Sequence, residues 1–335
     1  MRSIIISRTD KIGDVILTLP MLAQLKQLLP DCKIIFLCRS YTKPILECNT
    51  LIDQIVDWDE IDGLTTKQRV ERLKSLEADA IIHVFPHKKI AQDSFRAGIP
   101  LRIGTSHRLW HWLYCNKLLN FSRKNSELHE SQLNLKLLFP LGYTQQMTTK
   151  ALSEITLFDS VPQVDETVLS YLDKNRTTLI FHPHSRGSAR EWPIEYYVEL
   201  CNLLPEEKYN IVFCGTAEEE KTYNHALSGI KRAYLNAGGK LSLKQYISLI
   251  SCAEGLVAAS TGPLHIAAAC GIYAFGIYPP IRPMHPGRWA PIGKNVHVFV
   301  AQKECSDCRK SMPCHCMAEI EPQIVFKKIN ESFDS

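Results

Sequence analysis

Short apolar runs alternate with amphipathic segments along most of this chain of 335 residues. In the first part the pattern predicts a strand that begins with "SIII" at Ser3. Further strands are predicted at 33–38, 52–58 and 78–85, and helices at 19–29 and 67–78. Strands that alternate with helices indicate a parallel α/β sheet, because parallel strands need a crossover connection.

A second α/β pattern follows a weakly patterned stretch. Strands are predicted at 176–185, 209–215, 255–260 and 274–279, with helical segments between them. We therefore expect two α/β domains, residues 1–155 and 176–335, joined by a linker over 156–175. Ligands of such domains bind where the strands reach their carboxyl ends, here in a cleft between two facing domains.

Composition is that of a soluble globular protein, with 45% hydrophobic and 22% charged residues. No apolar run approaches the roughly 20 residues of a membrane span, and the first residues do not resemble a signal peptide. A cytoplasmic location is therefore expected.

Residues 1–150 hold 21 Lys and Arg against 15 Asp and Glu, whereas residues 151–335 hold 18 Lys and Arg against 20 Asp and Glu. This imbalance favours an anionic partner for the first domain, or it is ordinary surface variation.

Twelve cysteines fit a reducing compartment if they stay reduced. Eight lie in apolar segments, where cysteine usually behaves as a small buried hydrophobe. These eight are Cys32, Cys38, Cys48, Cys115, Cys201, Cys214, Cys252 and Cys270.

The first predicted strand ends in "RTDKIGDVILTLP", a turn with the single glycine Gly13, followed at once by Asp14. A dinucleotide site would need G-x-G-x-x-G here, so a nicotinamide-dependent oxidoreductase is disfavoured. An acid at this turn repels phosphate. Asp14 is therefore either a helix cap or an acid that faces a reacting group.

The stretch "GLVAASTGPLHIAAACG" predicts a buried strand, a turn and a helix rich in small residues. Backbone N–H groups at such a helix start can hold a diphosphate, and Gly262 permits close approach of a ligand. Ser260 and Thr261 add hydroxyl groups. The alternative is an ordinary strand, turn and helix with Thr261 as the cap.

Two basic loops are further candidates. "HPHSRGSAREWP" offers Ser185, Arg186 and Arg190 after a buried strand, and "FPHKKIAQDS" offers His87, Lys88 and Lys89. The first places hydrogen-bond donors and positive charge next to a helix start at the expected cleft, and the second places basic residues after a predicted strand. Either can instead be a solvated loop.

The aromatic and basic segment "RLWHWLY" at 108–114 has two interpretations. It either lies at a membrane surface or forms a packed core helix.

A cysteine-rich segment at 305–316, "CSDCRKSMPCHC", is a candidate structural metal site. Four thiolates within twelve residues can surround a tetrahedral zinc or an iron, and His315 can replace one of them. Reduced thiols or a labile disulfide are the alternatives. A metal here would brace a neighbouring loop without taking part in chemistry. The four cysteines are Cys305, Cys308, Cys314 and Cys316.

Six pieces of this sequence, taken in order, resemble glycosyltransferase family 9, the ADP-heptose:lipopolysaccharide heptosyltransferases. The pieces are "ISRTDKIGDVILTLP", "AGIPLRIG", "LHESQLNLKLLFPLGY", "HSRGSAREWP", "STGPLHIAAACG" and "HPGRWAPIG". The resemblance implies the GT-B fold, with two Rossmann-like doubly wound domains. The first domain would bind the acceptor and the second the nucleotide-sugar, in an inverting transfer that requires no metal cofactor.

Residue roles follow from the same resemblance. Asp14 matches the catalytic aspartate, and Arg190 stands where relatives often carry a lysine that contacts the donor phosphates. Glu219 matches an acid that contacts ribose, with Glu218 as the alternative, and Leu241 falls near the adenine pocket. Thr261, Gly262, Pro263 and His265 match the diphosphate turn. Lys11, His87, Lys88 and Lys89 are the expected acceptor-binding residues.

The implied partners are a nucleotide-sugar, with ADP-heptose favoured, and a glycolipid acceptor at the inner face of the inner membrane. A peripheral membrane position is compatible with this, and no nucleic acid partner is expected. Ser260 departs from the family, where an acid or amide is common, which bears on the identity of the donor.

Two alternative functions stay open. One is a related transferase with another nucleotide-sugar or a protein acceptor. The other is a non-catalytic sugar-nucleotide-binding protein, against which Asp14 and Arg190 both argue.

Overall fold

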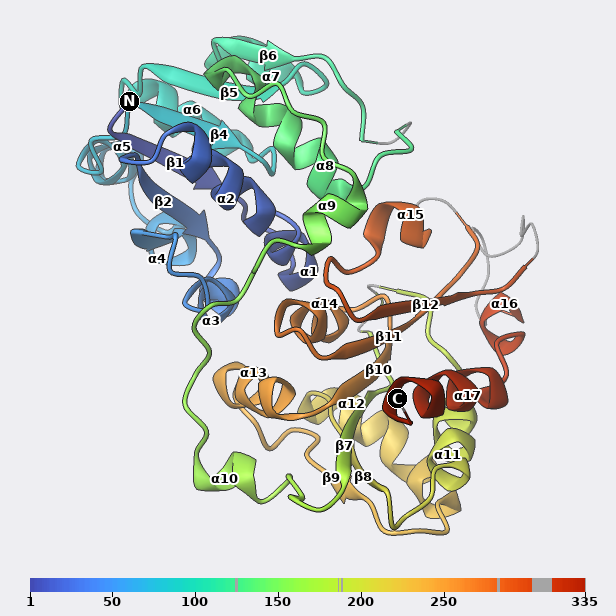
Figure 1. Cartoon of the computed structure of the whole chain (residues 1–335). Helices are drawn as coiled ribbons and strands as arrows, with labels where there is room; N and C mark the ends of the chain where they lie inside the picture. Colours follow the sequence, from blue (N-terminus) through green and yellow to red (C-terminus); the bar gives the residue numbers. More distant parts are fainter. Residues whose placement is uncertain (124–125, 186, 188, 282–283, 303–314, 335) are drawn as a thin grey trace. The chain divides into compact units, whose positions relative to one another are not determined.

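The chain forms two compact units, Met1–Ser160 and Val161–Ser335. The computed structural model describes residues 1–334 except 124–125, 186, 188, 282–283 and 303–314 (Figure 1). A short helix, α10 (Glu166–Leu169), lies within the residues expected to be a linker.

The first unit is built on a six-stranded parallel sheet in the order β3-β2-β1-β4-β5-β6. The strand order changes direction between β1 and β4, which makes this a doubly wound sheet with its switch point at those two strands. The strands are β1 (Ser3–Ser7), β2 (Lys33–Cys38), β3 (Gln54–Asp57), β4 (Ala80–His83), β5 (Leu101–Thr105) and β6 (Lys117–Leu119).

Helices cover both faces of this sheet. On one face the helices α4, α5 and α6 contribute Ile61, Leu73 and Ile90 to a core with alternate residues of the central strands. On the other face α2 and α8 lie side by side (Figure 1). The helices are α1 (Ile12–Ile16), α2 (Leu19–Leu28), α3 (Lys43–Leu46), α4 (Trp58–Asp62), α5 (Thr66–Lys74), α6 (Lys88–Arg96), α7 (Leu109–Tyr114), α8 (Glu130–Leu135) and α9 (Thr149–Ser153).

Helix α5 is shorter than the predicted helix over 67–78. It begins with a capping box between Thr65 and Gln68. It ends at Lys74, and Glu77 adopts a positive φ of 49° that no helix can continue. The apolar periodicity through Leu76 therefore persists beyond the helix, because Leu76 still packs into the core from the turn.

The second unit repeats the same topology with a six-stranded parallel sheet in the order β12-β11-β10-β7-β8-β9. Its switch point lies between β7 and β10. The strands are β7 (Thr177–His182), β8 (Tyr209–Phe213), β9 (Leu235–Asn236), β10 (Gly255–Ala259), β11 (Tyr273–Tyr278) and β12 (Val296–Val300).

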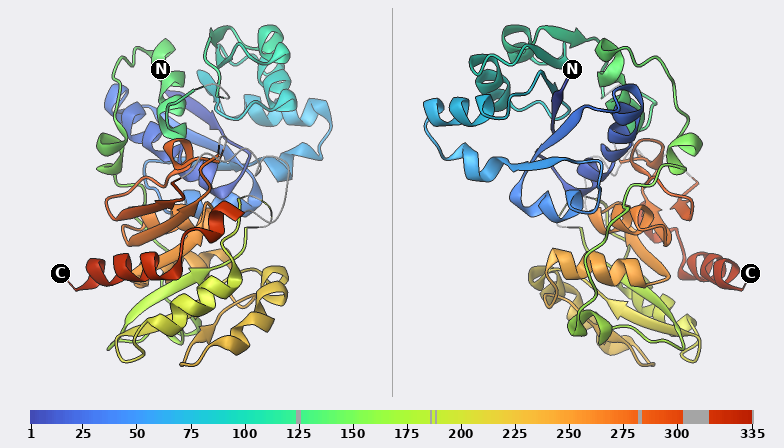
Figure 2. Two further views of the ribbon diagram at one scale, coloured as in Figure 1. Left: turned by 90° about the vertical axis from the view of Figure 1, so that its right-hand side faces the viewer. Right: turned by 60° about the vertical axis from the view of Figure 1, so that its left-hand side comes forward.

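One face of this second sheet carries a core with Leu200 of α11 and Val325 of α17. The other face carries α13 and α14 (Figures 1 and 2). Gly276 in β11 lets α14 approach closely, because a Cβ at this position would stand 2.7 Å from the side chain of Leu264. The helices are α11 (Ile194–Leu203), α12 (Ala217–Tyr223), α13 (Leu243–Cys252), α14 (Gly262–Ala269), α15 (Pro286–Trp289), α16 (His315–Ala318) and α17 (Pro322–Phe333).

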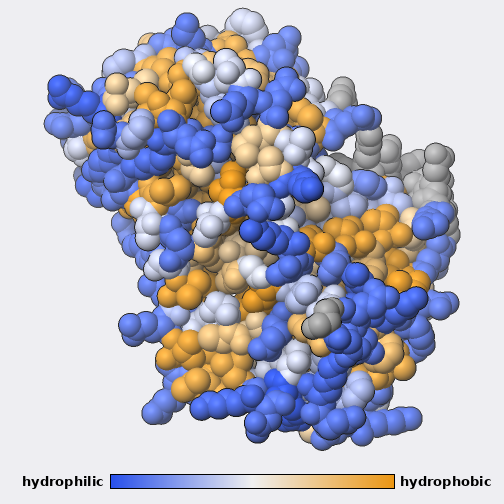
Figure 3. Space-filling model, viewed as in Figure 1, coloured by the Kyte–Doolittle hydropathy of each residue, from blue (hydrophilic) through white to orange (hydrophobic). Residues whose placement is uncertain are grey.

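The central strands are buried at every position, as in β1 and β10. Strands covered on both faces need continuous apolar runs, which is why these strands were predictable from the sequence. Edge strand β12 is more exposed, and hydrophobic surface lies over it (Figure 3).

Among the described residues, none of the eight cysteines expected in apolar segments forms a disulfide, and Cys252 and Cys270 are the two of these eight that are partly exposed. In the described part of the chain, no helix combines the length and apolarity needed to cross a membrane.

Candidate active site

The carboxyl ends of β1 and β4 carry the candidate residues of the first unit. Arg8, Asp10 and Asp14 follow β1, and the loop that contains His87 follows β4. Because β1 and β4 are hydrogen-bonded neighbours, the chain segments that follow them leave the sheet at one edge. This edge is the switch point where doubly wound domains hold their ligands.

Asp14 lies inside the first turn of α1, and the N-cap of that helix is Lys11. The cap interpretation of Asp14 is therefore wrong. Its carboxylate Oδ1 lies 2.5 Å from Arg8 Nη2, and 19% of its side chain is exposed. Among the described residues, Oδ2 has no hydrogen-bond partner, so one carboxylate oxygen is held and the other is available to a ligand.

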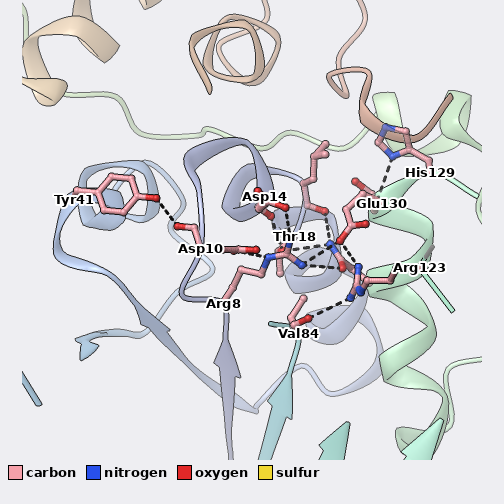
Figure 4. Close-up of polar contacts among 12 residues, drawn as sticks. Arg8, Asp10, Asp14, Thr18, Tyr41, Val84, Arg123, His129 and Glu130 are labelled. Atoms are coloured by element: carbon pink, nitrogen blue, oxygen red, sulfur yellow. Dashed lines mark hydrogen bonds and ion pairs between the residues drawn. The ribbon is translucent and has the colours of Figure 1, made fainter. Parts of the chain in front are cut away.

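Arg8 is the centre of this network, with only 3% of its side chain exposed. Its Nε lies 2.8 Å from Asp10 Oδ1 and its Nη1 lies 3.2 Å from Glu130 Oε1 (Figure 4). Burial alone would lower the pKa of Arg8. The charges of Asp10, Asp14 and Glu130 outweigh that effect and raise it, so the guanidinium stays charged.

Glu130 comes from α8, far along the chain from β1. It is almost fully buried and also pairs with Arg123, whose Nη2 donates to the carbonyl of Val84 at 3.2 Å. Asn134, one turn further along α8, donates to the carbonyl of Leu17 at 3.0 Å. Helix α8 is thereby fastened to the end of α1 through Asn134 and to the segment after β4 through Glu130 and Arg123.

Asp10 has an unusual environment for a carboxyl group. Burial raises its pKa to about 7, with Arg8 opposing the shift and the neighbouring charges of Asp14 and Glu130 adding to it. Its backbone carbonyl accepts a hydrogen bond of 2.6 Å from the Tyr41 hydroxyl. The site therefore contains a carboxyl group that titrates near neutral pH beside a second one, Asp14, that is paired with Arg8.

The expected acceptor-binding residues follow β1 and β4, and they differ in exposure and in side-chain contacts. Lys11 and Lys88 are exposed. Lys89 pairs with Asp62 at 2.9 Å on the surface. His87 is half-buried against Trp58, with ring centroids 5.8 Å apart, and burial lowers its pKa. We retain all four as predicted acceptor contacts.

In the second unit the expected donor-binding residues follow four adjacent strands. Ser185 and Arg190 follow β7, Glu219 follows β8, and Leu241 follows β9, directly before α13. The turn Ser260–Thr261 follows β10. Strands β9, β8, β7 and β10 are consecutive in a parallel sheet, so the topology brings all of these segments to one edge.

Thr261 occupies the N-cap position of α14, but its side chain makes no capping hydrogen bond. The hydroxyl oxygen is buried and has no hydrogen-bond partner among the residues that the structure describes. The interpretation of Thr261 as an ordinary capping residue is therefore wrong in its hydrogen bonding. Gly262 and Pro263 form the first positions of the helix, and His265 lies buried one turn in. A helix start with a buried, unpartnered hydroxyl is suited to an anionic ligand.

The loop after β7 is organised by Glu191. Its Oε1 accepts from the backbone N–H of Ser185 at 2.7 Å, and its Oε2 lies 2.8 Å from His184 Nδ1. Burial opposes ionisation of Glu191, but hydrogen bonds from His184 and Ser185 outweigh it and lower the pKa. The Ser185 hydroxyl also donates to Glu191 Oε1 at 2.8 Å. Arg190, which directly precedes Glu191 in the sequence, is half-buried.

Glu219 has a structural task in its own helix. It forms a capping box with Thr216, whose backbone N–H donates to Oε2 at 2.7 Å. His182 Nε2 lies 4.0 Å from the same oxygen, and its Nδ1 lies 3.1 Å from the Tyr246 hydroxyl. Burial lowers the pKa of His182 to about 4, with Glu219 opposing, so this imidazole is neutral.

Some predicted residues lie outside the described part of the chain, namely Arg186, Cys305, Cys308 and Cys314. Cys316 is described and buried in α16. Among the described residues, no cluster of three or more His, Cys, Asp or Glu side chains could hold a metal ion.

Sequence reasoning missed Arg8, Asp10, Glu130 and Arg123 as partners of Asp14. Arg8 and Asp10 stand in the same turn as Asp14, so a charged residue at the end of a buried strand was an available signal. Glu130 and Arg123 had no local signal, because only the fold brings α8 beside β1. His182 and Tyr246 were missed for the same reason.

The chain is similar to known proteins along most of its length. The family Glycosyltransferase family 9 (heptosyltransferase) matches residues 68–316. A Haemophilus influenzae protein with the provisional name glycosyltransferase is 29% identical over 301 residues, covering 87% of this chain and 86% of its own. Lipopolysaccharide heptosyltransferase 2 of Escherichia coli is 26% identical over 290 residues, covering 81% of each chain.

The fold is also shared with a solved structure, that of E. coli ADP-heptose lps heptosyltransferase II. Its TM-score is 0.77 at 21% identity, with 99% of this chain and 98% of that chain covered. The two parallel six-stranded sheets are the two halves of the GT-B fold. The chain belongs to glycosyltransferase family 9, the heptosyltransferases, and is a glycosyltransferase.

Proposed function

We propose that this enzyme transfers a heptose from ADP-heptose to a lipopolysaccharide inner-core acceptor, with inversion at the anomeric carbon. The observation that carries the proposal is the contrast between the two sheet edges. The first presents the carboxylate of Asp14, which is held by Arg8 and partly exposed. The second presents a helix start at which the buried hydroxyl of Thr261 has no partner among the described residues. A base and an anion site are the two parts that an inverting transfer from a nucleoside diphosphate sugar requires.

Asp14 acts as the general base in this proposal. Oδ1 stays on Arg8 while Oδ2 accepts the hydrogen bond of the acceptor hydroxyl. The acceptor oxygen forms a bond to the anomeric carbon, the bond from that carbon to the diphosphate oxygen breaks, and the hydroxyl proton passes to Asp14. The electron pair of the broken bond leaves with ADP. Arg8 keeps the carboxylate oriented during this step, because three acids hold its own guanidinium in place.

The donor diphosphate is proposed to bind at the turn before α14. Backbone N–H groups of Gly262 and the following residues point out of the helix start, and Pro263 has no N–H to offer. The Thr261 hydroxyl gains the partner it lacks. Arg190 adds positive charge from the loop after β7, where relatives often carry a lysine. These groups stabilise the negative charge that grows on the leaving diphosphate, so a divalent cation is not needed in this scheme.

The remaining donor contacts are proposed from the other strand ends. Leu241 lines the adenine pocket, and Ser185, Arg186 and Ser260 contact the phosphates. Glu219 contacts ribose through the carboxylate oxygen that does not accept from Thr216. The acceptor is proposed to be a glycolipid, with Lys11, His87, Lys88 and Lys89 facing its carboxylates and phosphates.

The deciding experiment uses a panel of nucleotide-sugars in thermal unfolding, followed by transfer assays with the best binder. A ligand that binds the native state raises Tm, so ADP-heptose should give the largest shift. Transfer to a heptose-deficient lipopolysaccharide should then be measured by mass spectrometry. A larger Tm shift and faster transfer with a UDP- or GDP-sugar would overturn the assignment of the donor.

A further inference from the structure

Helix α7 (Leu109–Tyr114) turns its apolar side chains toward solvent. Leu109 is 85% exposed, Trp112 64% and Leu113 69%, while His111 in the same helix is fully buried. Positions 109, 112 and 113 share one face of a helix. An amphipathic surface helix normally buries such a face and exposes its polar residues, so α7 is inverted.

Specific bonds hold this inverted orientation. His111 Nδ1 lies 3.1 Å from the backbone nitrogen of Thr105, and the indole Nε1 of Trp112 donates to the carbonyl of Ser106 at 2.8 Å. Gly104 makes room for the buried imidazole, because a Cβ at that position would stand 2.7 Å from His111 Nδ1. The exposed face of α7 is therefore a feature built into the fold.

The neighbouring helix α6 extends this surface. Phe95, 48% exposed, lies beside Tyr114 of α7 with ring centroids 5.9 Å apart. The guanidinium of Arg102 lies 5.2 Å from the centre of the Phe95 ring. We call Phe95, Leu109, Trp112 and Leu113 the α7 patch.

The chain around the α7 patch carries only one sign of charge. Residues 94–123 contain five Lys and Arg and no Asp or Glu. Three of these cations are exposed close to the patch in the sequence: Arg96 at the end of α6, Arg108 directly before α7, and Lys117 three residues after it. A hydrophobic surface within an acid-free, cationic segment complements an anionic, partly apolar surface.

We propose that the α7 patch docks this enzyme on an anionic lipid bilayer. Leu109, Trp112 and Leu113 enter the boundary between headgroups and acyl chains, and Arg96, Arg108 and Lys117 contact anionic headgroups. Tryptophan favours this boundary, because its ring is apolar and its N–H is polar. A second copy of this chain is a poor occupant, because two copies would bring their cations together without acids to offset them. Four side chains also fall short of the roughly 800 Å² per partner that a stable interface buries.

The test is flotation of the purified full chain with vesicles, in the absence of any sugar substrate. Wild type should float with vesicles of phosphatidylcholine and phosphatidylglycerol, and much less with phosphatidylcholine alone. The variant Leu109→Ser/Trp112→Ser/Leu113→Ser should lose at least about tenfold in vesicle affinity, since it removes three large apolar side chains. Val161→Ser/Leu169→Ser, which changes exposed apolar residues in the second unit, is the matched control and should float as wild type does.

A second variant separates charge from apolar contact. Arg96→Gln/Arg108→Gln/Lys117→Gln should lose the preference for phosphatidylglycerol, and the vesicle binding that it retains should be less sensitive to salt than that of wild type. Far-UV circular dichroism confirms that each variant folds. The proposal is overturned if wild type does not bind anionic vesicles, or if the α7 triple variant binds them unchanged. It is also overturned if light scattering shows a wild-type dimer that the triple variant dissociates without any vesicle binding.

Docking through the α7 patch does not depend on which sugar the enzyme transfers. Transfer to a soluble oligosaccharide acceptor should be unchanged in the α7 variant, because none of the patch residues belongs to the network around Asp14. If ADP-heptose proves to be the wrong donor, vesicle binding is still expected. If vesicle binding fails while transfer succeeds, the docking proposal alone is lost.

Discussion

The two sheet edges of this enzyme share one topology and carry opposite chemistry. At the end of β1, three carboxylates surround the buried Arg8 and form ion pairs with it. At the end of β10, the Thr261 hydroxyl is buried at a helix start without a hydrogen-bond partner in the described part of the chain. The comparison teaches that a doubly wound sheet supplies only the place for a ligand. The residues after each strand decide whether that place activates a nucleophile or receives an anion.

The ion-pair network around Arg8 and the buried hydroxyl of Thr261 also differ in their effect on the stability of the folded protein. A satisfied network is rigid and tolerates no missing member, because each loss leaves a buried charge behind. A buried hydroxyl without a hydrogen bond destabilises the free enzyme. A bound ligand that supplies the missing hydrogen bond offsets this loss of stability. Substitutions at the two edges should therefore affect activity and stability in different proportions.

The largest effect is expected for Asp14→Asn. It removes the proposed base while keeping the shape of the side chain, so transfer should fall about a thousandfold. Donor affinity by calorimetry should stay close to wild type, because Asp14 belongs to the first unit. Asp31→Asn at an exposed site is the control. A parallel loss of donor binding would show that Asp14 belongs to the donor site or to the fold.

The next effect concerns Arg190→Ala. Charge on the diphosphate grows as the sugar leaves, so turnover should fall about a hundredfold and donor affinity by less. Arg190→Lys should recover part of the rate, with the remainder lost to the geometry of the guanidinium. Arg176→Ala, which removes a surface pair with Asp173, should leave kinetics unchanged. Wild-type kinetics in Arg190→Ala would remove this residue from the site.

Thr261→Val separates activity from stability. The free enzyme should gain about 1 kcal/mol in unfolding free energy, because an unpartnered hydroxyl is removed. Donor affinity should fall severalfold. Thr216→Val is the opposite control, because its hydroxyl caps α12, and its loss should destabilise by about 1 kcal/mol. A Thr261→Val protein that is less stable than wild type would contradict the unpartnered state.

Asp10→Asn probes the network at the first edge through pH. The folded-state pKa of Asp10 is raised from 3.8 to about 7, so the folded state holds this proton more tightly than the unfolded chain does. The resulting stability is full below about pH 4 and is lost as pH rises toward 7. Asn mimics the protonated form, so the variant should lose less Tm than wild type between pH 5 and pH 8. Equal losses in both proteins would place the pKa of Asp10 near its ordinary value.

The smallest expected effect is that of a chelator on transfer. If Arg190 and the start of α14 balance the leaving diphosphate, activity should persist in EDTA. The same samples, purified without a histidine tag, should be analysed for zinc and iron bound at Cys305, Cys308, Cys314 and Cys316. Activity lost in EDTA and restored by Mg²⁺ would contradict the scheme. If the metal content is far below one equivalent and the four thiols titrate freely, the hypothesis of a structural metal at these cysteines is contradicted.

The sequence alone determined the repeated α/β pattern and the segments that hold Asp14 and Thr261. This was possible because buried parallel strands require continuous apolar runs, and because turns and helix starts have local signals in glycine, proline and small residues. The GT-B fold and the family followed from six short pieces in order.

The tertiary structure decided what those residues are paired with. Glu130 stands 122 positions from Arg8 in the chain, and only the packing of α8 beside β1 makes it a partner of the proposed base. Sequence could not tell whether 108–114 is a core helix, because its periodicity does not say which face is turned inward. The site that Gly104 leaves for His111 settles that orientation and turns Leu109, Trp112 and Leu113 outward. Local pattern specifies elements, whereas contacts between distant segments specify which side chains remain free to act.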